Sequence, residues 1–283
     1  MTLPGSLVGV EWLRRAMGDP LLVLADVRWY PDGSGPSRFE ESHIPGAVFV
    51  DVDADLASPK TKESGRHPLP SPEAFAQAME RAGIGDTSMV VAYDDAGGSN
   101  AARLWWMLSV TDHQVAVLDG GLQAWTGPLE SGPSRSRHGG VRFTHRPWPS
   151  DRIVDAAGVD RLRRDPKAVV LDARAPERYR AETEPIDPVP GHIPGARNAP
   201  WSENLDPATG RFLSPEDLRE KYRVRGVEEG REVVAYCGSG VTSCHDVLAL
   251  ELAAIRGAKL YVGSWSDWIT DPSRPVAQGS EPG

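Results

Sequence analysis

The second half of this chain repeats the first. The pentapeptide His-Ile-Pro-Gly-Ala occurs at residues 43–47 and again at 192–196. Three further matches follow the same order in both halves: an Asp-x-Arg segment (24–28 and 171–174), Val-Val-Ala-Tyr (90–93 and 233–236) and a tryptophan (Trp125 and Trp268). One pentapeptide could be chance, but four ordered matches indicate a duplicated domain. Each half must therefore be able to adopt the same fold.

Short apolar, β-branched runs alternate with helix-like stretches in each half. The expected strands are 21–27, 89–93, 115–118, 168–171, 232–236 and 259–262, and the expected helices are 72–82, 100–108, 215–222 and 242–256. Two of these helices begin with Ser-Pro and an acidic residue, at Ser71 and Ser214, which is the pattern of an N-cap with proline at the first helical position. The alternation predicts an α/β fold of two tandem domains, each a mostly parallel sheet flanked by helices.

The boundary between the halves falls in a segment without periodicity. Residues 127–150 are rich in Gly, Pro, Ser and Arg, a composition typical of linkers. We expect a first domain over 1–126, a linker over 127–150 and a second domain over 151–283.

Composition excludes several classes of function. A net charge of −9 argues against a surface for nucleic acid or anionic membranes, although a local pocket can still bind a small anion. The chain has no run of about 18 apolar residues, and its N-terminus lacks the basic-then-apolar pattern of a secretory signal. The two cysteines, Cys237 and Cys244, form no disulfide framework. A reducing cytoplasm is the expected location.

Cys237 carries the most chemical information. It follows the apolar run 233–236 and opens the loop Cys-Gly-Ser-Gly-Val-Thr, after which a helix-like stretch begins at Ser243. A strand, a tight glycine-containing loop and a helix N-terminus aim backbone N–H groups at the sulfur. Such a field favours the thiolate, which is the nucleophilic form. In the first half, the residue after the matching run 90–93 is Asp94.

Together these features resemble the tandem rhodanese-like sulfurtransferases. The similarity extends from about residue 7 to residue 268 and rests on the two pentapeptides, the Asp-x-Arg turns and the cysteine loop. In that family the N-terminal domain has lost its cysteine and the C-terminal domain is active, which agrees with Asp94 and Cys237. Thiosulfate-preferring members carry basic residues after the cysteine. The small, neutral Gly238 and Ser239 are similar to the loop of 3-mercaptopyruvate sulfurtransferases.

The resemblance implies a set of site residues. The implied catalytic residues are Cys237, Ser239, His67 and Asp53, the last three as a proton relay. The implied substrate-binding residues are Arg178, Arg180, Gly238, Gly240, Val241 and Thr242. Arg180 is the substitute for a second family arginine, because residues 184–190 contain none. An arginine farther from the sulfur suits the single carboxylate of mercaptopyruvate.

The expected reaction moves a sulfur atom from 3-mercaptopyruvate to an acceptor through a persulfide on Cys237. The expected partners are this small anionic donor and a thiol acceptor such as thioredoxin, with cyanide as an acceptor in vitro. The scheme requires no metal and no organic cofactor, and its two covalent half-reactions predict ping-pong kinetics.

Several alternatives remain open at this point. The donor could be thiosulfate, or the chain could be a non-catalytic sulfur-binding module. A cysteine-dependent phosphatase is disfavoured, because the sixth residue after the cysteine is Ser243 and not arginine. A dinucleotide-binding loop is disfavoured, because Gly238-x-Gly240 follows a cysteine and its third small residue would be Ser243.

Four further residues are expected to be structural. His43 and His192 recur in both halves, including the half that lacks the cysteine. Arg174, in the second Asp-x-Arg turn, is expected to form an ion pair within its own domain. Cys244 is expected to pack on a helix. The functional alternative is a resolving thiol that forms a reversible disulfide with Cys237.

Overall fold

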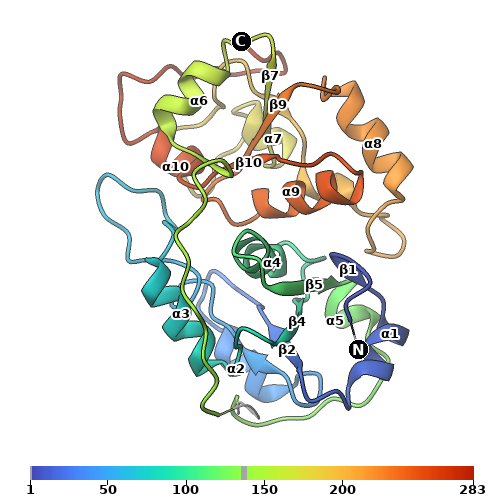
Figure 1. Ribbon diagram of the computed structural model, residues 1–283. Coiled ribbons are helices and arrows are strands. Elements are labelled where there is room, and N and C mark those ends of the chain that lie inside the picture. The colour runs from blue at the N-terminus through green and yellow to red at the C-terminus, as the bar shows by residue number, and fades with distance from the viewer. Residues whose placement is uncertain (1, 135–138) are drawn as a thin grey trace. The chain divides into compact units, whose positions relative to one another are not determined.

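The computed structural model describes residues 2–134 and 139–283 (Figure 1). It divides into two compact units. Unit 1 consists of Met1–Ser58, Leu69–Trp148 and Thr209–Arg211, and unit 2 of Pro59–Pro68, Pro149–Ala208 and Phe212–Gly283. Residues 59–68, which belong to the first half of the sequence, therefore pack with the second unit. Within the described residues, no helix has the length and apolar character needed to cross a bilayer.

Unit 1 is built on a five-stranded sheet in which every pairing is parallel. The strand order is β1-β5-β4-β2-β3. The strands are β1 (Leu7–Val8), β2 (Leu22–Asp26), β3 (Val48–Phe49), β4 (Met89–Tyr93) and β5 (Gln114–Leu118). The helices are α1 (Val10–Ala16), α2 (Gly35–Glu41), α3 (Pro72–Arg81), α4 (Ala101–Ser109) and α5 (Gly121–Ala124).

Unit 2 repeats this topology in the order β6-β10-β9-β7-β8, again with every pairing parallel. Its strands are β6 (Ile153–Val154), β7 (Ala168–Asp172), β8 (Arg197–Asn198), β9 (Glu232–Tyr236) and β10 (Lys259–Tyr261). Its helices are α6 (Ala156–Leu162), α7 (Pro176–Tyr179), the 3₁₀ helix η1 (Trp201–Asn204), α8 (Pro215–Val224), α9 (Ser243–Leu252) and α10 (Ser264–Trp268). The predicted duplicated α/β fold is confirmed.

The Asp-x-Arg turns hold buried ion pairs. Arg28 Nη2 lies 2.9 Å from Asp26 Oδ2, and Arg174 Nη2 lies 2.6 Å from Asp172 Oδ2. All four side chains are at most 4% exposed, so each charge is compensated within its own unit. This confirms the structural role expected for Arg174.

The two pentapeptide histidines are also structural. His43 Nδ1 is 2.7 Å from the carbonyl oxygen of Phe39, and its ring stacks on that phenylalanine. His192 Nδ1 is 2.8 Å from the carbonyl oxygen of Tyr179 and stacks on its ring in the same way. The recurring histidine therefore fastens the turn to the preceding helix in each unit.

Capping follows the sequence closely. Ser71 Oγ accepts a hydrogen bond from the N–H of Ala74, and Ser214 Oγ accepts one from the N–H of Asp217, both at 3.1 Å.

The helix expected over residues 242–256 is shorter than predicted, because α9 ends at Leu252. The chain turns at Ala254, whose φ is 62°, and this left-handed conformation cannot continue the helix.

The described parts of segment 127–150 contain no helix or strand, but they are not free chain. Glu130 forms an isolated β-bridge with His43. Phe143 stacks on His113, and Trp148 packs against Phe75. These apolar anchors fix most of the segment to unit 1.

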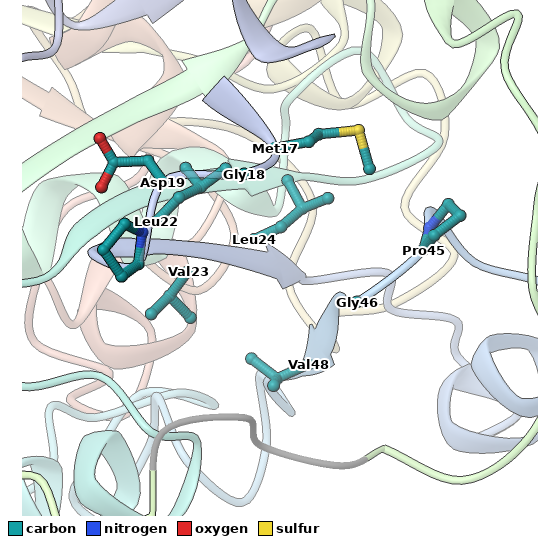
Figure 2. Close-up of a pocket in the computed structure, with 10 residues that line it drawn as sticks. Met17, Gly18, Asp19, Leu22, Val23, Leu24, Pro45, Gly46 and Val48 are labelled. Carbon is teal, nitrogen blue, oxygen red and sulfur yellow. The ribbon is translucent and has the colours of Figure 1, made fainter. Parts of the chain in front are cut away.

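Unit 1 also contains a pocket of about 240 Å³. The residues that line it are Met17, Gly18, Asp19, Pro20, Leu22, Val23, Leu24, Pro45, Gly46 and Val48 (Figure 2). Asp19 supplies the one titratable side chain of this lining, so the pocket has no constellation for chemistry.

Candidate active site

The fold places Cys237 at the point where β9 ends and the loop to α9 begins. The residue is 1% exposed. Its Sγ accepts a hydrogen bond from the N–H of Gly240 at 3.1 Å. Its own N–H donates to Ser264 Oγ at 3.0 Å, and its carbonyl oxygen accepts from the N–H of Trp265 at 2.9 Å. The start of α10 therefore fixes the backbone that carries the sulfur.

The loop needs glycine at position 240. Gly240 has φ of 81°, in the left-handed region that glycine tolerates best. A Cβ at this position would also collide with the carbonyl oxygen of Val262. Glycine therefore allows the loop conformation in which the N–H of Gly240 donates to the sulfur of Cys237.

Two opposing effects set the pKa of Cys237. Burial raises it, because the anion loses its hydration. The hydroxyls of Ser243 and Thr242 and the backbone N–H groups of Ser239 and Ser243 act in the opposite direction, and the net result is a lowered pKa. Of the converging loop donors expected from the sequence, the N–H of Gly240 hydrogen-bonds the sulfur directly. The lowered pKa favours the thiolate.

The equivalent loop of unit 1 holds a carboxylate. Asp94 Oδ1 accepts the N–H groups of Ala96 and Gly98, and Oδ2 accepts those of Asn100 and Ala101, each at 2.8 Å. Burial raises the pKa of Asp94, and these four donors oppose that effect. The pKa of Asp94 stays above its ordinary value. Each oxygen accepts two N–H groups, so no lone pair is left for an acid proton, and the ionised form fits the loop. A strand–loop–helix turn of this fold can therefore hold an anion with backbone N–H groups alone.

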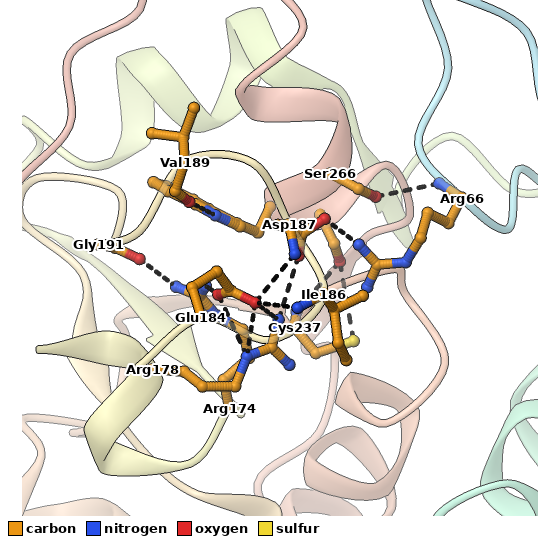
Figure 3. A network of polar contacts seen from close by, with 12 residues as sticks. Arg66, Arg174, Arg178, Glu184, Ile186, Asp187, Val189, Gly191, Cys237 and Ser266 are labelled. Atoms are coloured by element: carbon orange, nitrogen blue, oxygen red, sulfur yellow. Dashed lines mark hydrogen bonds and ion pairs between the residues drawn. The ribbon is translucent and has the colours of Figure 1, made fainter. Parts of the chain in front are cut away.

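Two arginines lie over the cysteine loop of unit 2 (Figure 3). Arg178, at the end of α7, forms a two-pronged pair with Glu184 and donates to Asp187 Oδ2 at 3.1 Å. Arg66 pairs with the other oxygen of Asp187. A Cβ added to Gly238 would lie 2.6 Å from Arg66 Nη2 and 3.6 Å from Arg178 Nη1. The site thus joins a buried cysteine sulfur with a lowered pKa to two cations that can orient an anion.

The comparisons with known proteins decide the family. Residues 9–128 and 155–271 both match the rhodanese-like domain. The chain belongs to the rhodanese-like sulfurtransferases. The probable 3-mercaptopyruvate sulfurtransferase of Pseudomonas aeruginosa is 45% identical over 97% of this chain and 98% of its own length. A putative thiosulfate sulfurtransferase of Mycobacterium tuberculosis, SseB, is 39% identical over 93% of each chain.

A solved structure supports the same assignment. The crystal structure of SseA from Escherichia coli, described with the fold and catalytic mechanism of 3-mercaptopyruvate sulfotransferases, matches with a TM-score of 0.80 and 32% identity. The match covers 94% of this chain and 100% of SseA. The family, the fold class and the enzyme class expected from the sequence are confirmed: this protein is a sulfurtransferase.

In this rhodanese-like sulfurtransferase the second arginine beside the loop is Arg66. The part of Arg180 in substrate binding stays a prediction. Arg180 pairs with Glu182 at 2.7 and 2.8 Å, and its side chain is 36% exposed. Sequence reasoning missed Arg66, which stands immediately before His67 in a segment that packs with unit 2. Its backbone N–H donates to Ser266 Oγ at 3.0 Å, which anchors it near α10.

The predicted relay residues occupy different parts of this sulfurtransferase. Ser239 lies in the loop, and His67 lies half-buried in the segment 59–68 of unit 2. Asp53 belongs to unit 1, where its Oδ2 accepts from Trp29 Nε1 at 2.8 Å. Their action as a relay stays a prediction.

Val241, Thr242 and Cys244 complete the turn into α9. The carbonyl oxygen of Val241 accepts the N–H of Cys244, and that of Thr242 accepts the N–H of His245, both at 3.1 Å. Cys244 is fully buried, and its Sγ contacts the carbonyl oxygen of Gly240 at 3.4 Å. Both cysteines of this sulfurtransferase are free thiols. Among the described residues, no group of three or more His, Cys, Asp or Glu is arranged to hold a metal ion.

The lowered pKa of Cys237 predicts a distinctive pH dependence. A depressed pKa keeps the thiolate populated as pH falls, so reactivity is lost only at pH values below the usual range. We expect the rate of inactivation by iodoacetamide to have its pH midpoint below about 8.5, the pKa of an ordinary cysteine. Cys237 and Cys244 lie on the same tryptic peptide, 232–256, so fragment-ion sequencing of that peptide assigns the label to one cysteine or the other. A midpoint at or above that value would show that burial outweighs the donors.

Proposed function

We propose that this enzyme transfers sulfur from 3-mercaptopyruvate to a thiol acceptor through a persulfide on Cys237. The observation that carries the proposal is the buried Cys237 Sγ, with a lowered pKa, below two arginine guanidiniums. The name of the Pseudomonas aeruginosa relative supports the choice of donor.

In the first half-reaction, the Cys237 thiolate attacks the thiol sulfur of 3-mercaptopyruvate. A sulfur–sulfur bond forms while the carbon–sulfur bond of the donor breaks, and the electron pair of the broken bond leaves as pyruvate enolate. The donor's sulfur remains on the enzyme as a persulfide. The N–H and hydroxyl donors that lower the pKa of Cys237 would stabilise this anionic group in the same way.

The enolate must then be protonated at carbon to give pyruvate. The proposal assigns this proton to the predicted relay of Ser239, His67 and Asp53. The evidence for the relay is the resemblance of these residues to family positions, together with the place of Ser239 in the cysteine loop.

In the second half-reaction, an acceptor thiolate attacks the outer sulfur of the persulfide. The sulfur–sulfur bond on Cys237 breaks, the acceptor leaves as a new persulfide and the Cys237 thiolate is regenerated. Thioredoxin or another small thiol is the proposed acceptor, and cyanide would leave as thiocyanate. The chemistry balances without a cofactor. A cytoplasmic location and no nucleic-acid or membrane partner remain part of the proposal.

Thiosulfate is the second candidate donor, because the Mycobacterium tuberculosis relative is named for it. The deciding experiment measures kcat/KM for 3-mercaptopyruvate and for thiosulfate with cyanide as the common acceptor. We expect 3-mercaptopyruvate to be preferred by about tenfold or more, the contribution of one charge-assisted hydrogen bond to its carboxylate. A preference for thiosulfate would reverse the assignment. If the protein turned over neither donor, the non-catalytic sulfur-binding module would be favoured.

A further inference from the structure

A pocket of about 640 Å³ in unit 2 lies next to the cysteine loop. Lys60 and Lys62 line it together with Ser266, a residue of α10. The backbone N–H of Ser266 donates to the carbonyl oxygen of Gly238 at 3.0 Å. Gly238 directly follows Cys237. The wall of the pocket is therefore hydrogen-bonded to the loop that carries the nucleophile.

The segment that carries the two lysines is fixed against the start of α10. The backbone N–H of Arg66 donates to Ser266 Oγ at 3.0 Å (Figure 3). A Cβ added to Gly65 would lie 2.3 Å from the carbonyl oxygen of Gly263, so this close approach needs glycine. Gly263 directly precedes α10, and the first residue of that helix accepts the N–H of Cys237. The lysine segment and the cysteine backbone thus share one support.

The pocket carries uncompensated positive charge. Among the residues that the structure describes, neither Lys60 nor Lys62 forms an ion pair with a carboxylate. Asp187 also lines the pocket, but two arginines already hold both of its oxygens. Glu63, the acidic neighbour of Lys62, is not part of the lining. In a chain of net charge −9, this local positive potential attracts anions.

The size of the pocket suits a molecule larger than the donor. Its volume lies within the range of about 300–1,000 Å³ that is typical of sites for drug-sized ligands, whereas 3-mercaptopyruvate is a three-carbon acid. Pro188 and Ile269 give the lining an apolar part beside the lysines. A thiol of about tripeptide size that also carries a carboxylate matches this volume and this charge.

We propose that this pocket is the acceptor site of the enzyme and that Lys60 and Lys62 select thiols that carry a carboxylate. This inference rests on the proposed function, in which a persulfide on Cys237 passes its outer sulfur to a thiol. The acceptor sulfur attacks the outer sulfur, the bond to Cys237 Sγ breaks, and its electron pair returns to Cys237 as the thiolate. The proton of the acceptor thiol ends on the transferred sulfur. The step therefore balances without an oxidant or a further reductant.

The test compares two acceptors that differ by one carboxylate, glutathione and its glycine ethyl ester. With wild-type enzyme we expect kcat/KM to be about fivefold higher for glutathione, the upper range for an exposed ion pair, and this advantage should shrink as the salt concentration rises. The double variant Lys60→Ala/Lys62→Ala should lose the advantage, and Lys60→Glu/Lys62→Glu should make the ester the better acceptor. Both lysines are exposed, so we expect these variants to fold.

Lys167→Glu is the matched control, because Lys167 is an exposed lysine of unit 2 outside the pocket lining. It should keep the wild-type preference for glutathione. A preference for glutathione that persists in both double variants would overturn the proposal, and so would its loss in Lys167→Glu.

The donor half-reaction separates an acceptor site from a general attraction of anions. In ping-pong kinetics, kcat/KM for the donor does not depend on the acceptor, so it is measured for 3-mercaptopyruvate with cyanide. An equal fall for 3-mercaptopyruvate and for glutathione in the lysine variants would overturn the acceptor site. Failure of the proposed function is a different result, because wild-type enzyme would then pass sulfur to neither cyanide nor a thiol.

Discussion

Cys237→Ser is expected to abolish sulfur transfer, with a fall in kcat of about 10⁴-fold or more, the range seen when a covalent nucleophile is removed. A serine hydroxyl is far less acidic than a thiol and cannot carry the donor's sulfur as a persulfide. The backbone donors of the loop remain in this variant. The loss of turnover therefore measures the contribution of the sulfur atom and not that of the surrounding N–H groups. Steady-state turnover of 3-mercaptopyruvate with cyanide as acceptor measures the effect.

Cys244→Ser is the matched control for this prediction. Cys244 is also a buried cysteine close to the loop, and its Sγ lies 3.4 Å from the carbonyl oxygen of Gly240. We expect its turnover to stay within a few-fold of wild type. Retention of turnover by Cys237→Ser within tenfold of wild type, or a comparable loss in Cys244→Ser, would contradict the assignment of the nucleophile.

Asp94→Ala is expected to destabilise unit 1 by about 3–5 kcal/mol. The substitution leaves four N–H groups of the loop without their acceptor, and buried donors without partners are costly. Urea unfolding followed by tryptophan fluorescence, to which both units contribute, measures the change. The lower midpoint should appear in the unit 1 transition, while the transition of unit 2 remains in place.

Asp94→Asn is the conservative comparison. Its side chain has the same shape, but it keeps one acceptor oxygen and presents an amide to the other two donors, so we expect an intermediate loss of stability. An alanine variant that unfolds at the wild-type urea concentration would mean that water or a solvent anion replaces the carboxylate. Either outcome reports on how strongly this loop binds an anion.

Much of the fold was predictable from the sequence, because the duplication and the buried strands leave strong patterns. β4 and β9 begin and end at the predicted residues, and both Ser-Pro helix starts are capped as expected. β1, β3, β6 and β8 were missed. Each has two residues, too few to show any periodicity, and the parallel neighbour supplies the hydrogen bonds that define it.

The candidate site was predictable where its chemistry is local. The cysteine, the glycine turn and the helix start lie within consecutive residues, so their geometry follows from the sequence. Arg66 does not. It is separated from Asp187 by more than a third of the chain, and its segment packs with the unit formed by the other half of the sequence. Arg180 was expected because residues 184–190 contain no second family arginine. It pairs with Glu182, and its part in substrate binding stays a prediction.

The mass and the fragment ions of the peptide that contains Cys237 and Cys244 test the central claim most directly. After incubation with 3-mercaptopyruvate and no acceptor, we expect this peptide to gain about 32 Da, one sulfur atom, with pyruvate released in equal amount. Adding a thiol or cyanide should return the mass to its starting value. Pyruvate formation without any added mass on Cys237, or added sulfur found on Cys244 alone, would contradict the account.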